Sequence, residues 1–161
     1  YMQYTHKYKS PVGELTLLAT DDALVGLWLG CQKYHGNVAN IPVGDNDVLN
    51  RVVRWLDAYF AGHAAQIDFR IAPRGTEFQR RVWRALCEIP HGQTRTYGEI
   101  ASRIGCKAPR AVGVAIGHNP ISIIIPCHRV IGANGQMTGY AGGIHNKEIL
   151  LKTEQGIIPA K

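Results

Sequence analysis

The spacing of apolar residues changes along this chain, and this change restricts the possible folds more than any other feature. Residues 14–20 and 23–29 are two β-compatible stretches separated by the turn Asp21-Asp22, which predicts an antiparallel hairpin. From Asp47 to residue 60, apolar side chains recur at three- and four-residue steps, which predicts an amphipathic helix that ends at Gly62. Residues 67–71 alternate in polarity like a further strand, and residues 73–75 read as a linker.

Helical signals dominate the second half. Residues 76–79 and 96–99 both fit a capping box, in which side chains satisfy the first N–H groups of a helix. Gly105 suits the end of the second helix, and Pro109 suits the start of a third over residues 110–117. Two short helices joined by a glycine-containing turn predict a helix-turn-helix, although bundles that bind no DNA offer similar pairs. We expect an α+β protein with a sheet-plus-helix domain over residues 1–72 and a mostly helical domain over residues 73–161.

Charge is distributed unevenly between these parts. The chain of 161 residues carries a net charge of +6. Residues 1–73 hold six Lys/Arg and seven Asp/Glu, a net charge of −1, whereas residues 74–161 hold twelve and five, a net charge of +7. A basic half favours a polyanionic partner such as nucleic acid, and a solvated basic surface without a partner is the alternative.

Several classes of protein are disfavoured. No apolar run approaches the length of a membrane span, and the first residues lack the apolar core of a signal peptide, so we expect no membrane partner. The four cysteines form no C-x-x-C pair, which gives no support to a zinc or redox motif. We expect reduced thiols in a cytoplasmic protein, associated with the nucleoid if the organism is a prokaryote.

Residues 119–135 contain the groups that can carry chemistry. Three consecutive isoleucines end at Pro126, and Cys127, His128 and Arg129 follow directly. A thiol becomes a useful nucleophile when basic or cationic neighbours lower its pKa, so Cys127 is a candidate nucleophile; a buried core thiol is the alternative. Adjacent side chains of an extended chain point to opposite faces, so either the backbone bends at residues 126–127 or a water carries the proton to His128.

This segment resembles the active-site signature of the O6-alkylguanine-DNA alkyltransferases, in the run from Pro126 to Val130. The start of their recognition helix resembles residues 110–113, the loop that closes over the base resembles residues 139–143, and their last helix resembles residues 147–154. The resemblance covers residues 76–155 closely and residues 1–72 only as a hairpin with a helix. It implies a ribonuclease-H-like first domain and a winged-helix-like second domain.

Roles for individual residues follow from the resemblance. It implies that Cys127 accepts the alkyl group, that His128 takes the thiol proton through a water, and that Glu154 holds His128. Asn119 should fix the active-site turn so that the nucleophile is exposed. Tyr97 should donate a proton or hydrogen bond to the guanine as O6 gains charge.

Further residues should bind the substrate. The resemblance implies that Tyr140 and the backbone of Ala141 line the base pocket, with Ile116 against the plane of the base. Arg110 should replace the extruded nucleotide in the duplex, and Ala111 should allow a close approach of the helix to the minor groove. Small residues along this helix predict weak sequence dependence rather than major-groove readout.

The resemblance thus implies direct reversal of DNA damage. A monomer would bind double-stranded DNA that contains alkylated guanine, flip the base, and move its methyl group irreversibly to Cys127, with O4-methylthymine as a further candidate substrate. We expect no cofactor and no metal, because Cys31, His6, His35 and His63 do not match the spacing of the zinc site found in some relatives. A damage sensor without turnover is the main alternative, and a cysteine hydrolase is a weaker one.

Overall fold

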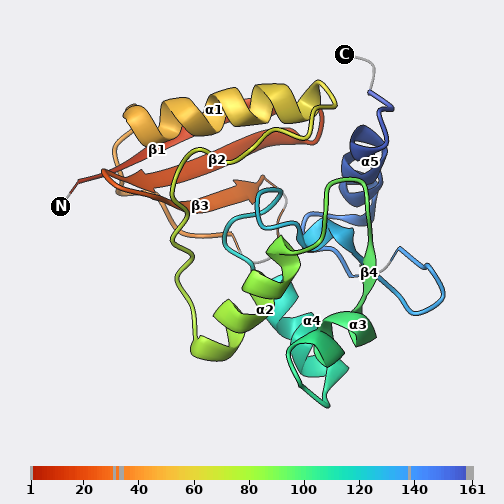
Figure 1. The fold of residues 1–161 in the computed structure, drawn as a ribbon. Helices are drawn as coiled ribbons and strands as arrows, with labels where there is room; N and C mark the ends of the chain where they lie inside the picture. Colours follow the sequence, from red (N-terminus) through yellow and green to blue (C-terminus); the bar gives the residue numbers. More distant parts are fainter. Residues whose placement is uncertain (1, 31, 33–34, 138, 159–161) are drawn as a thin grey trace.

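The computed structural model describes residues 2–158 apart from residues 31, 33, 34 and 138. Its first half is a three-stranded antiparallel sheet in the order β1-β2-β3, with one helix packed across it (Figure 1). The strands are β1 (Gln3–Ser10), β2 (Gly13–Thr20) and β3 (Leu24–Leu29), and the helix is α1 (Asp47–Phe60). In the part of the chain described, no helix has both the length and the apolar character needed to cross a membrane.

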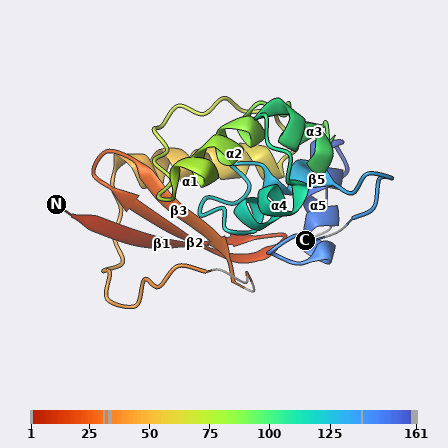
Figure 2. The same cartoon turned by 90° about the horizontal axis from the view of Figure 1, so that it is seen from below.

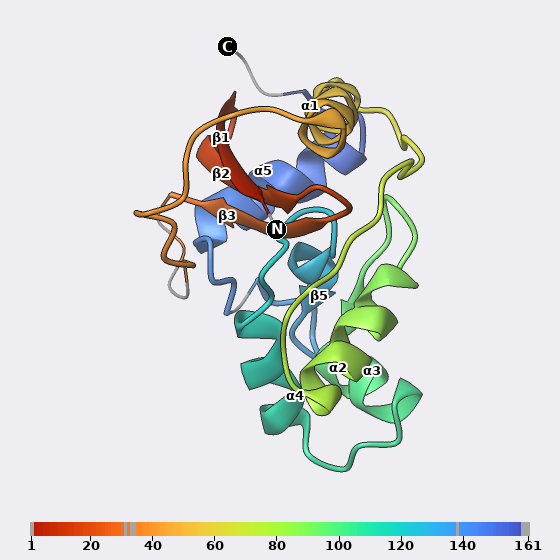
Figure 3. The ribbon, with the colours of Figure 1, turned by 90° about the vertical axis from the view of Figure 1, so that its left-hand side faces the viewer.

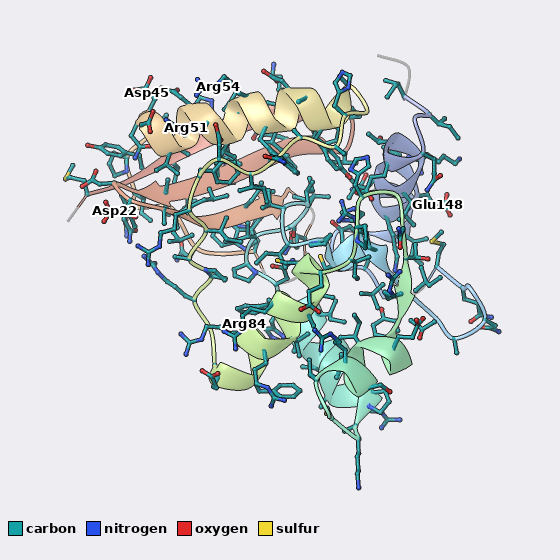
Figure 4. All side chains as sticks on the ribbon, viewed as in Figure 1. Asp22, Asp45, Arg51, Arg54, Arg84 and Glu148 are labelled. Atoms are coloured by element: carbon teal, nitrogen blue, oxygen red, sulfur yellow. The ribbon has the colours of Figure 1, made fainter. Side chains whose placement is uncertain are left out.

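The predicted hairpin and first helix are confirmed. β2 pairs with β3 in an antiparallel register that shifts between Leu18 and Ala19. The side chain of Asn46, one residue earlier than expected, accepts a hydrogen bond from Leu49 N and caps α1. The helix ends before Gly62, whose φ of +92° suits glycine. Apolar side chains of α1 face the sheet, whereas Arg54 points away from it (Figure 4).

Two features of the first half differ from the prediction. β1 was not predicted from the sequence, which is mostly polar there, yet it pairs with β2 along its whole length. The predicted strand over residues 67–71 is wrong, because only Ile71 forms a bridge, with Leu24. Hydrogen bonds from Leu24 N to Arg70 O and from Ala72 N to Leu24 O show that this segment meets β3 at its first residue only.

The second half is mostly helical, as predicted. It contains α2 (Glu77–Cys87), α3 (Tyr97–Arg103), α4 (Pro109–Gly117) and α5 (Ile144–Glu154), with a short parallel pair β4 (Arg95–Thr96) and β5 (Val130–Ile131). Both capping boxes form, at Thr76 and at Thr96. Gly105 follows α3 with a φ of +71°, and Pro109 opens α4. Seen from below, α3, α4 and α5 lie toward one end of the strands (Figure 2).

The two halves meet along the edge of the sheet. Leu27 N of β3 donates to Pro120 O at 2.8 Å, and Ser122 N donates to Leu27 O at 2.9 Å. The segment that carries the candidate nucleophile is therefore paired with an edge strand of the first half. Figure 3 shows the resulting layers, with α1 above the sheet and α2, α3 and α4 below it.

Candidate active site

A tight turn precedes the candidate nucleophile. Asn119 spans it, since its side-chain amide donates to Ile125 O at 2.8 Å and its side-chain oxygen accepts from Ile121 N at 3.0 Å. Ile123 lies inside this turn with a φ of +72°, a conformation that a β-branched residue adopts only under strain. Cys127 then opens a single 3-10 turn, Cys127–Arg129, so the backbone does bend at this point. The turn is thus closed by Asn119 and buried among isoleucines.

Cys127 lies inside the protein rather than on its surface. Its exposed fraction is 5%, so the expectation of an exposed nucleophile is wrong for this conformation. Burial raises the pKa of the Cys127 thiol, whereas hydrogen bonds from Asn119 and Ser122 and the charge of Lys147 act in the opposite direction. The balance keeps the thiol protonated at neutral pH, and it becomes a strong nucleophile only when a base removes the proton.

His128 is such a base, and Glu154 holds it. Nε2 of His128 lies 2.5 Å from Oε2 of Glu154, with both side chains fully buried. The carboxylate can only accept, so Nε2 carries the proton and Nδ1 is left as an acceptor. Nδ1 is buried and has no hydrogen-bond partner in the part of the chain described. Burial lowers the pKa of His128, although Glu154 acts in the opposite direction. The lowered pKa favours the neutral imidazole.

Glu154 is itself surrounded by donors. Arg129 Nε donates to Oε1 at 2.7 Å and Nη2 donates to Oε2 at 3.2 Å, while Gly92 N donates to Oε1 at 3.2 Å. Burial alone would raise the pKa of Glu154, but the hydrogen bonds from His128 and Arg129 and the charge of Arg129 outweigh it and hold this pKa well below its usual range. Glu154 therefore remains ionised and keeps His128 in one orientation.

Three residues at this site were not among the candidates from sequence. Arg129 was considered only as a neighbour of the thiol, yet its guanidinium is paired with Glu154. Lys147 is buried at an exposed fraction of 1%, and its ammonium group donates to Val130 O. Tyr59 of α1 donates to Glu154 Oε2 at 2.5 Å. The sequence does carry a signal for Lys147, because it is a lysine within a helical stripe whose other members are buried. No sequence signal marks the contacts of Arg129 and Tyr59.

A groove beside α4 gathers several predicted substrate-binding residues. It has a volume of about 700 Å³, and its lining residues include Tyr97, Arg110, Tyr140 and Ala141. The hydroxyl of Tyr97 approaches the backbone at Gly139, since a Cβ placed there would lie 3.2 Å from it.

Two of the predicted residues lie elsewhere. Ile116 is buried at an exposed fraction of 4% and is not among the described residues that line the groove, and neither is Ala111, which is exposed. The structure therefore does not place Ile116 against a base in this groove. Among the described residues, no cluster of three His, Cys, Asp or Glu side chains could hold a metal; Cys31 lies outside them.

Two family profiles match the chain. Residues 3–73 match "6-O-methylguanine DNA methyltransferase, ribonuclease-like domain", and residues 77–156 match the DNA binding domain of the same family. The chain belongs to this family. It is 50% identical over 153 residues to the methylated-DNA–protein-cysteine methyltransferase of Methanosarcina mazei, covering 94% of this chain and 97% of the relative. It is 49% identical over 152 residues to the enzyme of the same name from Mycobacterium tuberculosis, covering 94% and 92%.

Comparison with solved structures gives the same family. The crystal structure of Mycobacterium tuberculosis OGT in complex with DNA superposes with a TM-score of 0.87 at 46% identity, covering 99% of this chain and 96% of that one. The predicted family and α+β fold class are confirmed, and the chain is a methylated-DNA–protein-cysteine methyltransferase with a DNA-binding second half. The damage sensor without turnover and the cysteine hydrolase are accordingly set aside.

Proposed function

We propose that this protein repairs DNA by moving the methyl group of O6-methylguanine to Sγ of Cys127, once per molecule. The observation that carries the proposal is the buried pair of His128 and Glu154, which leaves Nδ1 of His128 as an acceptor without a partner among the described residues. An imidazole held in this way can take the thiol proton through one bridging water. The thiol needs such a base, because burial raises the pKa of Cys127.

The reaction then balances without a cofactor. A bond forms between Sγ and the methyl carbon while the bond from that carbon to O6 breaks, and its electron pair stays on the guanine. The guanine takes up a proton in place of the methyl group, and we propose Tyr97 in the groove as its donor. Tyr97 regains a proton from solvent and His128 loses to solvent the proton that it took from the thiol, so protons balance. The product thioether lies outside the reversible redox chemistry of thiols, so the protein should act only once. O4-methylthymine also carries a methyl group on an exocyclic oxygen and is a further candidate substrate.

We propose that the protein binds duplex DNA as a monomer through the minor groove at α4. The duplex hides O6, so the base must leave the stack, at a cost of roughly a few kcal/mol. Arg110 and Tyr140 line the same groove. This supports a flipped base that is bound beside Tyr140 while Arg110 fills the gap that the base leaves in the duplex. The small residues of α4, Ala111 among them, support a close approach to the backbone of the DNA.

Intact-mass measurement tests the transfer. Incubation with duplex DNA that contains O6-methylguanine should add one methyl group at Cys127 and then stop, and Cys127→Ala should bind the DNA without a mass gain. Turnover well beyond one methyl per molecule would refute the single-turnover mechanism, and a methyl group on another cysteine would refute Cys127 as the acceptor.

Arg110→Ala tests base flipping. We expect it to slow transfer from duplex DNA far more than alkylation by free O6-benzylguanine, which needs no flipping. Single-turnover rates on both substrates measure the difference. Equal slowing on both would mean that Arg110 supports the pocket or the fold instead.

A further inference from the structure

Tyr59 connects the first half of the chain to the proposed proton relay. It lies on α1, is fully buried, and donates to Glu154 Oε2 at 2.5 Å. The same oxygen lies 2.5 Å from His128 Nε2, and the Tyr59 hydroxyl is 3.4 Å from that nitrogen. The ring of Tyr59 meets the ring of His128 edge-on, at 6.5 Å between centroids and 79° between planes. Arg129 Nη2 also donates to this oxygen, at 3.2 Å, so one carboxylate oxygen receives a donor from the first half of the protein and two from the second.

We propose that Tyr59 is a positioning residue of the relay: its hydroxyl fixes Glu154 and thereby sets how strongly His128 holds a proton. This inference rests on the proposed function, because it assumes that His128 is the base. Tyr59 itself touches neither the thiol nor the alkylated base in the proposal. Its hydrogen bond to Glu154 at 2.5 Å is much shorter than its approach to His128 Nε2 at 3.4 Å, so it would act chiefly through Glu154.

The hydroxyl is suited to donate and not to ionise. Burial and the adjacent Glu154 raise the pKa of Tyr59 well above its ordinary value, so the phenol is protonated at neutral pH. A donor to a carboxylate oxygen stabilises its negative charge and so weakens its attraction for the other donors. With Tyr59 in place, Glu154 therefore pulls less strongly on the proton of His128 Nε2.

Removing the hydroxyl should make His128 more basic. Glu154 Oε2 would then interact more strongly with His128, and a protonated imidazole would be stabilised. The other groups that act on His128 would be unchanged: Arg129 from the adjacent position and Lys147 from α5 both disfavour its protonation. The ring of His91 meets the ring of Tyr59 edge-on, at 6.0 Å between centroids. A base that is already protonated cannot take the thiol proton, so reaction at mildly acidic pH should slow.

If the Tyr59 hydroxyl only stabilised the fold, its removal would lower the melting temperature without changing the pH dependence of alkylation. A buried hydroxyl with one good acceptor contributes to stability, and its loss leaves a destabilised protein with unchanged chemistry. Only a role through Glu154 and His128 shifts the pH dependence of alkylation. The pH profile therefore distinguishes the two roles, whereas the melting temperature does not.

The chain offers a matched control. Tyr8 Oη donates to Asp57 Oδ1 at 2.6 Å, which is the same kind of bond in the same half of the chain, but this pair is exposed and joins β1 to α1. Tyr8→Phe and Tyr59→Phe thus delete the same atom from equivalent hydrogen bonds. The two pairs differ in burial and in contact with the relay, and the melting temperatures measure the effect of the first difference.

The experiment measures alkylation of the full chain by free O6-benzylguanine from about pH 5.5 to 9, by intact mass, with melting temperatures for each variant. We expect Tyr59→Phe to move the acidic limb of the profile upward by about half a pH unit or more, which is about threefold slower on that limb. Rates should converge with the wild type at high pH. Tyr8→Phe should leave the limb in place. A Tyr59→Phe profile that superimposes on that of the wild type, or an equal shift in both variants, overturns the inference.

A second variant covers the case in which Tyr59→Phe does not fold. Placing 3-fluorotyrosine at position 59 alone keeps the ring and the hydroxyl but makes the hydroxyl a stronger donor. The acidic limb should then move to lower pH, opposite to the effect of Tyr59→Phe, and a limb that stays in place would also overturn the inference. Failure of the wild type to become alkylated would instead refute the proposed function itself.

Discussion

At the scale of single residues, the burial of a lysine beside the thiol has a measurable consequence. Lys147 is almost fully buried and its charge opposes the rise in the pKa of Cys127. Burial lowers the pKa of Lys147 to about 8, so much of its charge is present at neutral pH. Lys147→Met should raise the pKa of Cys127 and slow its alkylation by free O6-benzylguanine at pH 7 by about tenfold, the equivalent of one pKa unit.

The measurement is the pH dependence of the alkylation rate, which should shift to higher pH in Lys147→Met. Lys152→Met is the control, since Lys152 lies on the same helix with an exposed side chain. Identical pH profiles for the wild type and Lys147→Met would show that the charge of Lys147 does not act on the thiol.

Individual site residues differ in how far sequence could find them. Cys127, His128 and Glu154 were found through a motif and its resemblance, and the structure brings the last two into contact. Tyr59 was assigned to the apolar stripe of its helix, since a tyrosine there looks the same whether or not its hydroxyl has a function. Its contact with Glu154 joins positions 95 residues apart, a distance that no local pattern describes.

At the scale of secondary structure, local chemistry was predictive where it fixes the ends of helices. The two capping boxes depend only on residues three apart, and both form. Strand pairing depends on partners elsewhere in the chain. β1 was missed because its own residues are mostly polar. A strand was wrongly predicted over residues 67–71, because their alternating polarity is typical of a strand but only Ile71 has a pairing partner, Leu24.

The capping box at Thr96 gives a prediction at this scale. Thr96 accepts from Glu99 N at 3.1 Å and so fixes the start of α3, where Tyr97 is the first residue. Thr96→Ala should cost about 1 kcal/mol of stability and should also slow transfer from methylated duplex DNA, because Tyr97 loses its fixed position. Thr76→Ala removes the same motif from α2, which begins at Glu77, outside the groove.

Thermal melting and single-turnover transfer rates, measured below the melting temperature of both variants, separate the two effects. Similar losses of stability with slower transfer only in Thr96→Ala would support the role of Tyr97. Equal transfer rates in both variants would argue that the position of α3 does not limit the reaction.

At the scale of the whole molecule, the sequence predicted the class of fold but not how its halves fit together. The change in periodicity and the uneven charge indicated a small sheet followed by a basic helical part. The contact between β3 and residues 120–122 could not be predicted, because it joins an edge strand to a turn that is held by Asn119. Tyr59 adds a second link between the halves through Glu154.

These links make the stability of the whole protein depend on pH. The folded state holds the pKa of Glu154 below its ordinary value, so the stabilisation is complete above about pH 4.3 and is lost as the pH falls further. The folded state also lowers the pKa of His128, so the unfolded chain binds a proton more readily below about pH 6.5. Both effects have the same sign, and the melting temperature should fall on acidification from pH 7 to pH 4.

Glu154→Gln tests the part due to the carboxylate. At pH 7 it leaves the largely buried Arg129 without its charged partner, which should cost about 3 kcal/mol or more. The difference from the wild type should narrow below about pH 4, because the unfolded wild-type chain then takes up a proton at Glu154 and the advantage of the folded carboxylate is lost. Asp57→Asn, which alters an exposed carboxylate bonded to Tyr8, should track the wild type at each pH. Melting temperatures from pH 3 to 8 measure all three proteins, and a Glu154→Gln deficit that does not change with pH would contradict the assigned ion pair.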